Sequence, residues 1–347
     1  MKILYLYAEV MGYTIATLNE LSKLDNEIHV VCWDLKKLTP FQHSRVKNIN
    51  FYNRSDFNNH ELILFVKNLK PSIIVISGWI DKGYLKVASI YKKNGIPIVT
   101  GLDSQWNGTL KQYIVSTFNF ILKLFFSHVW VAGPMQYEYA RRLGYKKDKI
   151  IYNLYSANLD LFNHSYFFSI EEKRRKMPHR FLFVGRFETV KSIELLLDVW
   201  DALKSERKDW VLHLIGEGSI KLTSKILDNV IISNFMQPDN LIKEVRNSGC
   251  FILPSSYEPW GVVIHEFAAS GLPIICSDKC GASAEFVING FNGFVFESGQ
   301  YKSLYDSMIK IINLSDDMLN NFSVNSNKLA QRITPITSAE NLLSILK

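Results

Sequence analysis

The sequence contains few cysteines, four among 347 residues. They are Cys32, Cys250, Cys276 and Cys280, and only the last two lie close together. Their spacing fits neither a disulfide framework nor a metal site, and no histidine accompanies the close pair. The pattern argues against a disulfide-stabilised or zinc-binding fold and predicts a reducing compartment.

The sequence also lacks a secretion signal and an unbroken apolar run. Residues 1–10, MKILYLYAEV, read as a buried strand, with no apolar segment followed by a cleavage site. The most apolar window, residues 113–132, is interrupted by Asn119, Lys123 and His128, so it is too broken to span a membrane. We therefore predict a cytoplasmic protein.

The apolar residues at 113–126 allow two interpretations. One face of the expected helix carries five apolar side chains: Ile114, Phe118, Ile121, Leu122 and Phe125. A core helix buries such a face, whereas an interfacial membrane helix presents it to lipid. We expect a core helix and retain the membrane helix as the alternative.

The positive charge of the chain is concentrated in its first half. Residues 1–165 carry 20 Lys and Arg against 12 Asp and Glu, a net charge of +8, whereas the remainder is near neutral at −1. Basic residues flank and follow the apolar window: Lys111, Lys123, Arg141, Arg142, Lys146, Lys147 and Lys149. An anionic membrane surface is the partner this pattern predicts, and a merely solvated basic surface is the alternative.

Strand and helix patterns alternate along the chain. In the first half, short runs rich in branched and aromatic residues occur at 2–8, 27–33, 72–77, 96–101 and 128–133. Helical patterns near 14–24, 57–69, 82–94 and 108–126 separate these runs. Such alternation predicts a parallel sheet covered by helices on both faces, which binds ligands at the carboxyl ends of its strands.

A polar, basic stretch at residues 169–180 interrupts the alternation, and a second series of strands starts at Phe181. We therefore predict a first Rossmann-like domain at residues 1–167, a linker at 168–180 and a second Rossmann-like domain at 181–347. The last helix is a candidate to pack back on the first domain.

The most informative segment is PSSYEPWGVVIHEFAASGLPIICSD, residues 254–278, in which Glu258 and Glu266 lie around a Pro-Trp-Gly turn. A strand pattern precedes this turn and a helix pattern follows it. The first N–H groups of that helix lack helical partners and carry the positive end of its dipole, so they favour phosphate. The flanking carboxylates accept hydrogen bonds from hydroxyl groups. A diphosphate that joins two polyols is a nucleotide sugar, which we predict as the ligand.

This segment resembles the E-x7-E signature of retaining glycosyltransferases with the GT-B fold, in particular family 4. The strand–Gly-Arg–Lys–helix unit at 181–200, the strand ending in Gly-x-Gly at 210–219 and the stretches 229–245 and 284–299 are similar to that family in the same order. The first half is similar in its alternation and in the unit at 127–153. The resemblance implies an α/β fold with two facing doubly wound Rossmann-like domains and a cleft between them.

The resemblance also implies a donor site. By position, Arg186 and Lys191 would bind the diphosphate, Glu258 the transferred sugar and Glu266 the ribose hydroxyls. The remaining donor-binding positions are Gly12, Gly185, Gly216, Met236, Pro259, Trp260, Gly261 and Val262.

One position departs from the family pattern. Asp103 stands where many relatives carry a histidine near the reacting sugar, and it is a candidate to orient an acceptor hydroxyl. We expect Arg186, Lys191, Glu258 and Asp103 to be the catalytic residues. His265 is expected to be a packing residue, because successive helix positions point in different directions.

No Asp-x-Asp motif, which holds the metal in GT-A enzymes, occurs in the sequence. Arg186 and Lys191 would supply the positive charge that the leaving diphosphate needs, so we predict a metal-independent enzyme without a cofactor.

The predicted activity is retaining transfer of a hexose or N-acetylhexosamine from a UDP- or GDP-linked donor. The acceptor is a carbohydrate or a polyprenyl-diphosphate-linked glycan, in bacterial cell-surface polysaccharide or glycan assembly, at the cytoplasmic face of the inner membrane and without nucleic acid. Two alternatives stay open: a nucleotide-sugar epimerase or hydrolase on the same fold, and a non-catalytic regulatory subunit that binds nucleotide sugars.

Overall fold

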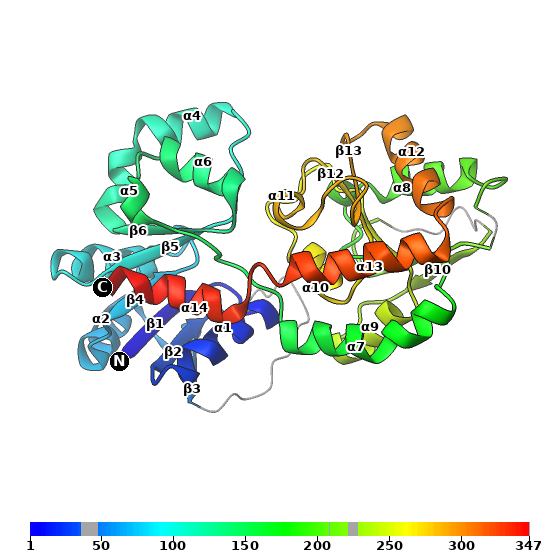
Figure 1. Cartoon of the computed structure of the whole chain (residues 1–347). Helices are drawn as coiled ribbons and strands as arrows, with labels where there is room; N and C mark the ends of the chain where they lie inside the picture. Colours follow the sequence, from blue (N-terminus) through cyan, green and yellow to red (C-terminus); the bar gives the residue numbers. More distant parts are fainter. Residues whose placement is uncertain (36–47, 208, 221–227, 347) are drawn as a thin grey trace. The chain divides into compact units, whose positions relative to one another are not determined.

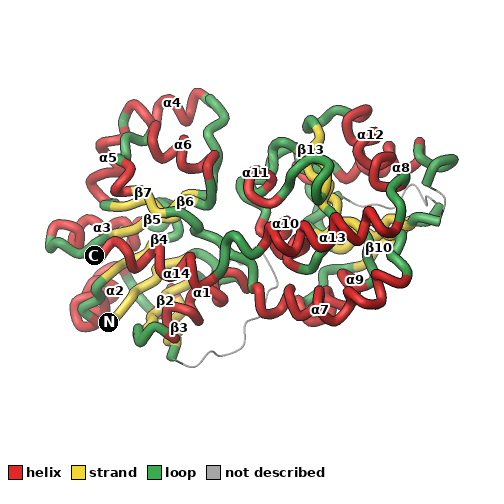
Figure 2. Tube along the Cα trace, viewed as in Figure 1, coloured by secondary structure: helices red, strands yellow, loops and turns green. Residues whose placement is uncertain are grey.

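The computed structural model describes residues 1–35, 48–207, 209–220 and 228–346. The chain forms two compact units. Unit 1 consists of residues 1–156 and 333–347, and unit 2 of residues 157–332. Each unit contains one parallel sheet with helices packed around it (Figures 1 and 2).

The sheet of unit 1 has seven strands in the order β3-β2-β1-β4-β5-β6-β7. The strands are β1 (Lys2–Tyr7), β2 (Glu27–Cys32), β3 (Ile49–Asn53), β4 (Ile73–Ile76), β5 (Ile98–Leu102), β6 (His128–Val131) and β7 (Ile150–Ile151). The helices are α1 (Gly12–Lys23), α2 (Asn59–Leu69), α3 (Lys82–Lys93), α4 (Leu110–Thr117), α5 (Asn119–Phe125), α6 (Pro134–Arg142) and α14 (Pro335–Leu343). Short 3-10 turns lie at Arg54–Asp56, Lys147–Lys149 and Ser344–Leu346. The strand order reverses between β1 and β4, which is the switch point of a doubly wound sheet.

The sheet of unit 2 has six strands in the order β10-β9-β8-β11-β12-β13. The strands are β8 (Arg180–Val184), β9 (Val211–Ile215), β10 (Val230–Ser233), β11 (Cys250–Leu253), β12 (Ile274–Ser277) and β13 (Gly293–Phe296). The helices are α7 (Leu159–Arg175), α8 (Ile193–Ala202), α9 (Pro238–Arg246), α10 (Val262–Ala269), α11 (Ser283–Phe286), α12 (Tyr301–Ile312) and α13 (Asp316–Ala330), with a 3-10 turn η3 at Thr189–Lys191.

Several strands of the two sheets are buried along their whole length. Every residue of β4, β11 and β12 is buried. Helices cover both faces of a parallel sheet, so these strands have no polar face, and this is why they read as continuous apolar runs. The predicted fold class of two doubly wound α/β sheets is confirmed.

Unit 1 differs from the predicted elements in two places. The strand β3 was not predicted, because its residues Ile49–Asn53 mix polar and apolar side chains and only Ile49 is buried. The single helix expected near 108–126 is divided into α4 and α5. Phe118 joins them with backbone angles of φ −94° and ψ 29°, outside the helical region.

The linker expected at 168–180 lies elsewhere. Residues 168–175 belong to α7, and the boundary between the units falls after Ser156. The helix continues through this basic stretch because Lys173 is buried: its ammonium donates to the backbone oxygens of Ser248 (2.9 Å) and Val245 (3.4 Å) at the end of α9. Cations stabilise such a helix C-terminus.

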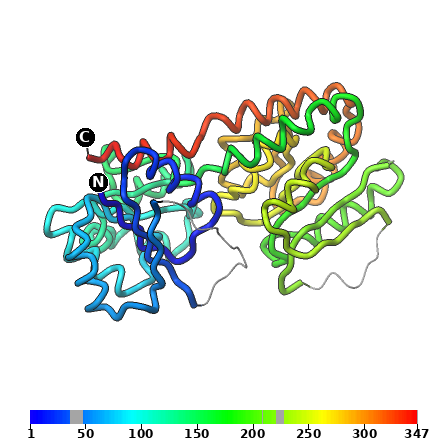
Figure 3. The backbone as a smooth tube through the Cα atoms, turned by 90° about the horizontal axis from the view of Figure 1, so that it is seen from below, coloured from blue at the N-terminus to red at the C-terminus, as the bar shows by residue number. Residues whose placement is uncertain are grey.

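The end of the chain returns to unit 1. Helix α14 packs against α1, as two views show (Figures 1 and 3), and it buries Ala339 and Leu342. The hydroxyl of Ser156 donates to the backbone oxygen of Ile333 (3.5 Å), so the two segments of unit 1 meet where each adjoins unit 2.

His265 joins the two ends of unit 2. Its Nδ1 accepts a hydrogen bond from the backbone N–H of Ala157 (3.0 Å), and its Nε2 donates to the backbone oxygen of Ala330 (2.9 Å). The ring is fully buried and stacks on Phe286, with ring centroids 4.1 Å apart. Burial lowers the pKa of His265 to about 4, so it is neutral at pH 7. Its packing role agrees with the expectation from the sequence.

We expect His265→Ala to lower the free energy of unfolding by about 2–4 kcal/mol, because two buried backbone groups lose their partner and a cavity opens. In the unfolded chain this histidine gains its proton near pH 6.5, but in the folded chain only near pH 4. Stability is therefore lost as pH falls from 6.5 towards 4, and the variant should lack that part of the loss. Chemical denaturation at pH 7.5 and pH 5 measures both effects. The exposed His164 supplies the control, since His164→Ala should change neither.

Candidate functional site

The residues expected to bind the donor diphosphate, base and sugar lie at one edge of the sheet of unit 2. Arg186 and Lys191 follow β8, Gly216 follows β9, Met236 follows β10 and Glu258 follows β11. These four strands are consecutive in the parallel sheet, so their carboxyl ends lie side by side. The loops after β9 and β10 are also joined directly, because the Glu217 carboxylate accepts from the backbone N–H of Phe235 (3.3 Å).

Lys191 and Glu258 form an ion pair in which the ammonium donates directly to the carboxylate. Each side chain is only 15% exposed. The backbone N–H of Ser256 donates to the oxygen of Val190 (2.8 Å), which binds the loop after β11 to the 3-10 turn that ends at Lys191. The structure thereby brings together two residues that are distant in sequence and were predicted to touch neighbouring parts of one ligand.

The loop that carries Glu258 is fixed on its other side by the segment after β12. The backbone N–H of Glu258 donates to Lys279 (3.1 Å), and its oxygen accepts from Gly281 (3.1 Å). Gly261 has φ +87°, and a Cβ there would lie 2.9 Å from Cγ of Glu258. Glycine is therefore required for the turn and for the position of the glutamate.

A second glycine is required where β9 ends. Gly216 has φ +151°, and a Cβ there would lie 1.9 Å from the backbone oxygen of Gly185. The two loops can approach this closely only because position 216 has no side chain. Gly185 itself donates its N–H to Ile215 (3.1 Å), which holds the backbone before Arg186 against β9.

The N-terminus of α10 lies beside the ion pair of Lys191 and Glu258. Helix α10 begins at Val262 after Gly261, and no side chain caps its N-terminus among the described residues. Its first N–H groups therefore offer a positive dipole end to an anion. Trp260 precedes the turn and is 2% exposed, with its ring packed on Phe286, so only its main chain lies at the helix start. Pro259 and Val262 are half-buried.

Arg186 differs from Lys191 in its surroundings. It is exposed in the loop after β8, and its guanidinium makes no hydrogen bond or ion pair with the described residues. Its guanidinium can therefore turn towards an anion without breaking an existing contact. An exposed cation and a paired, largely buried cation thus follow the same strand, β8.

Glu266 lies in the second turn of α10 and is half-buried. Burial raises the pKa of Glu266 to about 7 from its ordinary value of 4.5. A carboxylate that is poorly solvated by water forms strong hydrogen bonds with the hydroxyl groups of a ligand. This agrees with the predicted binding of ribose hydroxyls, which stays a prediction.

The two residues expected from unit 1 lie at the carboxyl edge of its own sheet. Gly12 begins α1 after β1, and Asp103 follows β5. The phenol of Tyr155 donates to Oδ2 of Asp103 (3.3 Å), and Nε2 of Gln136 donates to its backbone oxygen (2.9 Å). Burial, then the Asp103 charge, raises the pKa of Tyr155 far above its ordinary value. Tyr155 could not be predicted from the sequence, because a tyrosine 52 positions from Asp103 belongs to no pattern.

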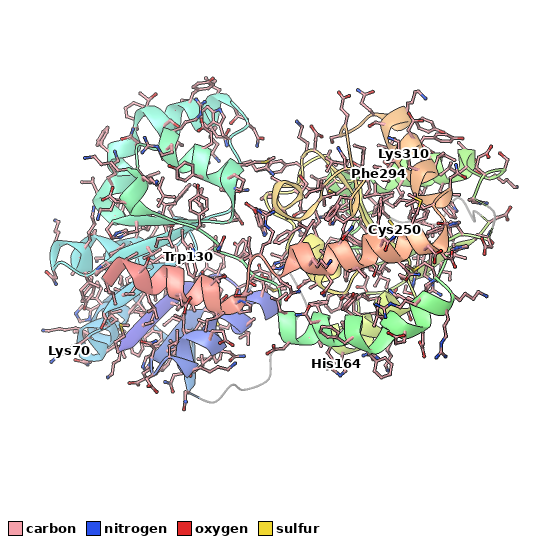
Figure 4. All side chains as sticks on the ribbon, viewed as in Figure 1. Lys70, Trp130, His164, Cys250, Phe294 and Lys310 are labelled. Atoms are coloured by element: carbon pink, nitrogen blue, oxygen red, sulfur yellow. The ribbon has the colours of Figure 1, made fainter. Side chains whose placement is uncertain are left out.

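Two hollows lie outside the predicted site. In unit 2, a groove of about 410 Å³ lies between β13 and α12, and Lys310 there packs over the ring of Phe294 at 5.2 Å (Figure 4). In unit 1, a cavity of about 10 Å³ is lined by Tyr5, Tyr7 and Tyr155 among others, which is room for about one water molecule. No predicted donor-binding residue lines either hollow.

The cysteines and acidic residues form no further centre in the described part of the chain. All four cysteines are free thiols. Among residues 1–35, 48–207, 209–220 and 228–346, no group of three or more His, Cys, Asp or Glu is arranged to hold a metal ion.

Comparison with known proteins agrees with this geometry. Residues 167–329 match the family model for "Glycosyl transferases group 1". The spore coat protein SA of Bacillus subtilis is 28% identical over 184 residues, 47% of this chain and 47% of that protein. The capsular polysaccharide biosynthesis glycosyltransferase CapM of Staphylococcus aureus is 29% identical over 155 residues, 42% of this chain and 40% of that protein. The chain thus spans less than half the length of these relatives.

Similar solved structures cover the whole chain. HepE from Anabaena, in complex with UDP and glucose, matches with a TM-score of 0.72 at 16% identity, over 100% of this chain and 99% of that one. WaaG, a glycosyltransferase involved in lipopolysaccharide biosynthesis, matches with a TM-score of 0.69 at 11% identity, over 100% of both chains. This likeness shows the GT-B fold. Residues 167–329, most of unit 2, are thus similar to the glycosyl transferases group 1 family.

The substitution Glu266→Gln should raise the stability of the fold at high pH but weaken nucleotide binding. Between pH 4.5 and 7 the folded chain holds a proton on Glu266 that the unfolded chain has lost, so the wild type loses stability as pH rises through this range. The variant should therefore be more stable at pH 8 by about 1–3 kcal/mol and unchanged at pH 4. It should also bind UDP or GDP about 10- to 100-fold more weakly, because a charged acceptor is lost. Thermal melts and titration calorimetry measure the two effects, and unaltered nucleotide affinity would remove Glu266 from the site.

Proposed function

We propose that the chain is a retaining glycosyltransferase that moves a hexose or N-acetylhexosamine from a UDP- or GDP-linked donor to a carbohydrate or lipid-linked acceptor. The acceptor belongs to cell-surface polysaccharide or glycan assembly. The observation that carries this proposal is the pairing of Lys191 with Glu258 beside the uncapped start of α10. HepE, with UDP and glucose bound, and the capsule and lipopolysaccharide enzymes among the similar proteins support the choice of donor and pathway class.

The proposed chemistry follows from where the charges lie. The bond between the anomeric carbon and the diphosphate breaks, and negative charge grows on the leaving phosphate. Lys191, Arg186 and the N-terminal dipole of α10 stabilise that charge. The new bond forms from an acceptor hydroxyl on the same face of the sugar, and its proton passes to the leaving phosphate. Configuration is therefore retained, and the products are a glycoside and a nucleoside diphosphate.

Leaving-group stabilisation by side chains predicts an enzyme that needs no metal. Activity should survive EDTA, and Lys191→Ala or Arg186→Ala should each lower turnover by about 10²–10³-fold, comparable to the loss of another preorganised electrostatic donor. Release of nucleoside diphosphate from a radiolabelled donor measures this. Loss of activity in EDTA with recovery in manganese or magnesium would contradict the mechanism. Lys204→Ala, which removes an exposed cation elsewhere in unit 2, is the control.

Two other functions remain to be separated from transfer. An epimerase or hydrolase would act on the donor with no acceptor present, whereas a regulatory subunit would bind the donor and leave it intact. Asp103 bears on the second alternative, because it stands where many relatives carry a histidine and is already engaged by Tyr155. Incubation of labelled donor with and without a lipid extract distinguishes the three functions.

The acceptor side of the proposal includes an anionic membrane surface. The core helix expected at 113–126 is confirmed only in part: Leu122 and Phe125 of α5 pack against the core of unit 1, but no residue of α4 or α5 is fully buried. Seven large apolar side chains are exposed here and form what we call the α4–α5 apolar face: Leu110, Tyr113, Ile114, Phe118, Phe120, Ile121 and Leu124. Leu110 is 76% exposed and Leu124 61%. Exposed apolar clusters of this size mark interaction surfaces.

Basic side chains border the α4–α5 apolar face. Between residues 104 and 147 the chain has six Lys and Arg and one acid, Glu138. The Arg142 guanidinium lies 4.6 Å from the ring of Trp106, which in turn packs on Tyr113 of α4 with centroids 5.0 Å apart. Aromatic and aliphatic groups surrounded by cations fit the interface of an anionic bilayer. No described helix has the length and apolar character that crossing a bilayer requires, so we propose reversible docking at the cytoplasmic face of the inner membrane.

We expect the chain to co-sediment with phosphatidylglycerol vesicles and not with phosphatidylcholine vesicles. Each basic side chain near the surface contributes about 1 kcal/mol. Arg141→Glu with Arg142→Glu should therefore weaken binding by at least about tenfold, and Phe120→Ser with Leu124→Ser should weaken it without altering the salt dependence.

Charge reversal elsewhere on unit 1 is the matched control. Lys67→Glu with Lys86→Glu changes the net charge by the same amount on exposed positions of α2 and α3. This variant should bind vesicles as the wild type does. Equal losses in both charge-reversal variants, or indifference to lipid charge, would contradict docking through α4 and α5.

A further inference from the structure

The ion pair between Lys191 and Glu258 joins two residues that the proposed function gives to different parts of the donor. In the described chain, Glu258 is the partner of the Lys191 ammonium, and both side chains are 15% exposed. At this degree of burial, an unpaired charge is costly, because water replaces the lost partner only in part. A phosphate that reaches the Lys191 ammonium therefore competes with the Glu258 carboxylate for its charge.

We propose that Glu258 and the donor diphosphate compete for the Lys191 ammonium, so that the carboxylate acts as a latch on the diphosphate site. The inference rests on the proposed function. A diphosphate that approaches the start of α10 finds Lys191 already neutralised, and it must draw the ammonium away from Glu258. Arg186, exposed and without a partner among the described residues, makes the first contact and requires no such exchange.

The competition discriminates between donor and product. When a nucleotide sugar binds, the sugar hydroxyls donate to Glu258 and replace the hydrogen bond that Lys191 withdraws. When transfer is complete, the nucleoside diphosphate carries no sugar, and Glu258 is left without that replacement. The carboxylate then regains Lys191 and weakens the hold on the product. The pair thereby favours binding of donor and release of nucleoside diphosphate.

The backbone keeps the two partners in reach of each other throughout this exchange. Ser256 binds Val190, one residue before Lys191, and Gly281 and Lys279 hold the backbone of Glu258. Only the side chains need to move. Gly261 supplies the space, because any Cβ there would lie 2.9 Å from Cγ of Glu258.

The test is nucleotide binding by the full chain carrying Glu258→Gln. We expect UDP or GDP to bind about tenfold more tightly than to wild type, which is the effect of one charge-assisted contact. Binding of the corresponding nucleotide sugar should gain less or should weaken, so the ratio of donor to product affinity falls. In a Lys191→Ala background, Glu258→Gln should change affinity less than about twofold, because the contested ammonium is gone.

Glu188→Gln is the matched control. Glu188 lies in the loop after β8 that also carries Lys191. Its carboxylate accepts from the hydroxyl of Ser219 (2.7 Å) and not from Lys191. The substitution removes the same charge, so a gain as large as that of Glu258→Gln would assign the effect to general repulsion and overturn the latch. Thermal melts establish that each variant is folded.

Inorganic pyrophosphate separates failure of the latch from failure of the proposed function. If wild type binds UDP or GDP but Glu258→Gln binds them no more tightly, the latch is wrong and the function stands. If wild type binds neither nucleotide but Glu258→Gln gains affinity for pyrophosphate, the latch stands and the nucleotide site is wrong. If the gain persists in the Lys191→Ala background, or no anion binds either protein, the latch is overturned.

Discussion

The pairing of β8 with β11 is the contact on which the candidate site depends. These strands are neighbours in the sheet although 65 residues lie between the end of β8 and the start of β11. They run parallel, with Phe181 opposite Cys250 and Leu182 opposite Phe251. Their following loops must therefore leave the sheet at the same edge. Lys191 follows one strand and Glu258 follows the other, so the strand order alone brings a cation and an anion to one place. Every further feature of the site, from Gly261 to the start of α10, is built around that meeting.

The same topology explains which parts of the site could be predicted from the sequence. Gly261, Glu258 and Glu266 lie in one short segment, where a turn and a helix start are set by local chemistry, and their placement was predicted correctly. The apolar strands β4, β11 and β12 were equally clear, because strands buried on both faces leave continuous apolar runs. The contact between Tyr155 and Asp103 could not be found, since it depends on which loops adjoin in space.

The linker shows how composition misleads when a charged side chain is buried. A run of Lys and Arg after residue 169 is typical of solvent-exposed connections. In the structure, Lys173 instead donates to the backbone oxygens of Val245, in the last turn of α9, and Ser248, just after it. The neighbouring basic residues lie in the final turn of α7, where the helix dipole favours them. Composition gives the charge of a side chain but not the partner that makes its burial tolerable.

The helices α4 and α5 pose the converse problem. A stripe of apolar residues is identical in sequence whether a helix packs on a core or lies on a membrane, because both environments exclude water from one face. The decision depends on whether another element of the chain covers the stripe. Here α5 is covered in part, because Leu122 and Phe125 pack against the core of unit 1. Phe118, Phe120 and Leu124 stay exposed. An anionic bilayer, which is partly apolar itself, is the surface that we propose covers these apolar side chains and their basic rim.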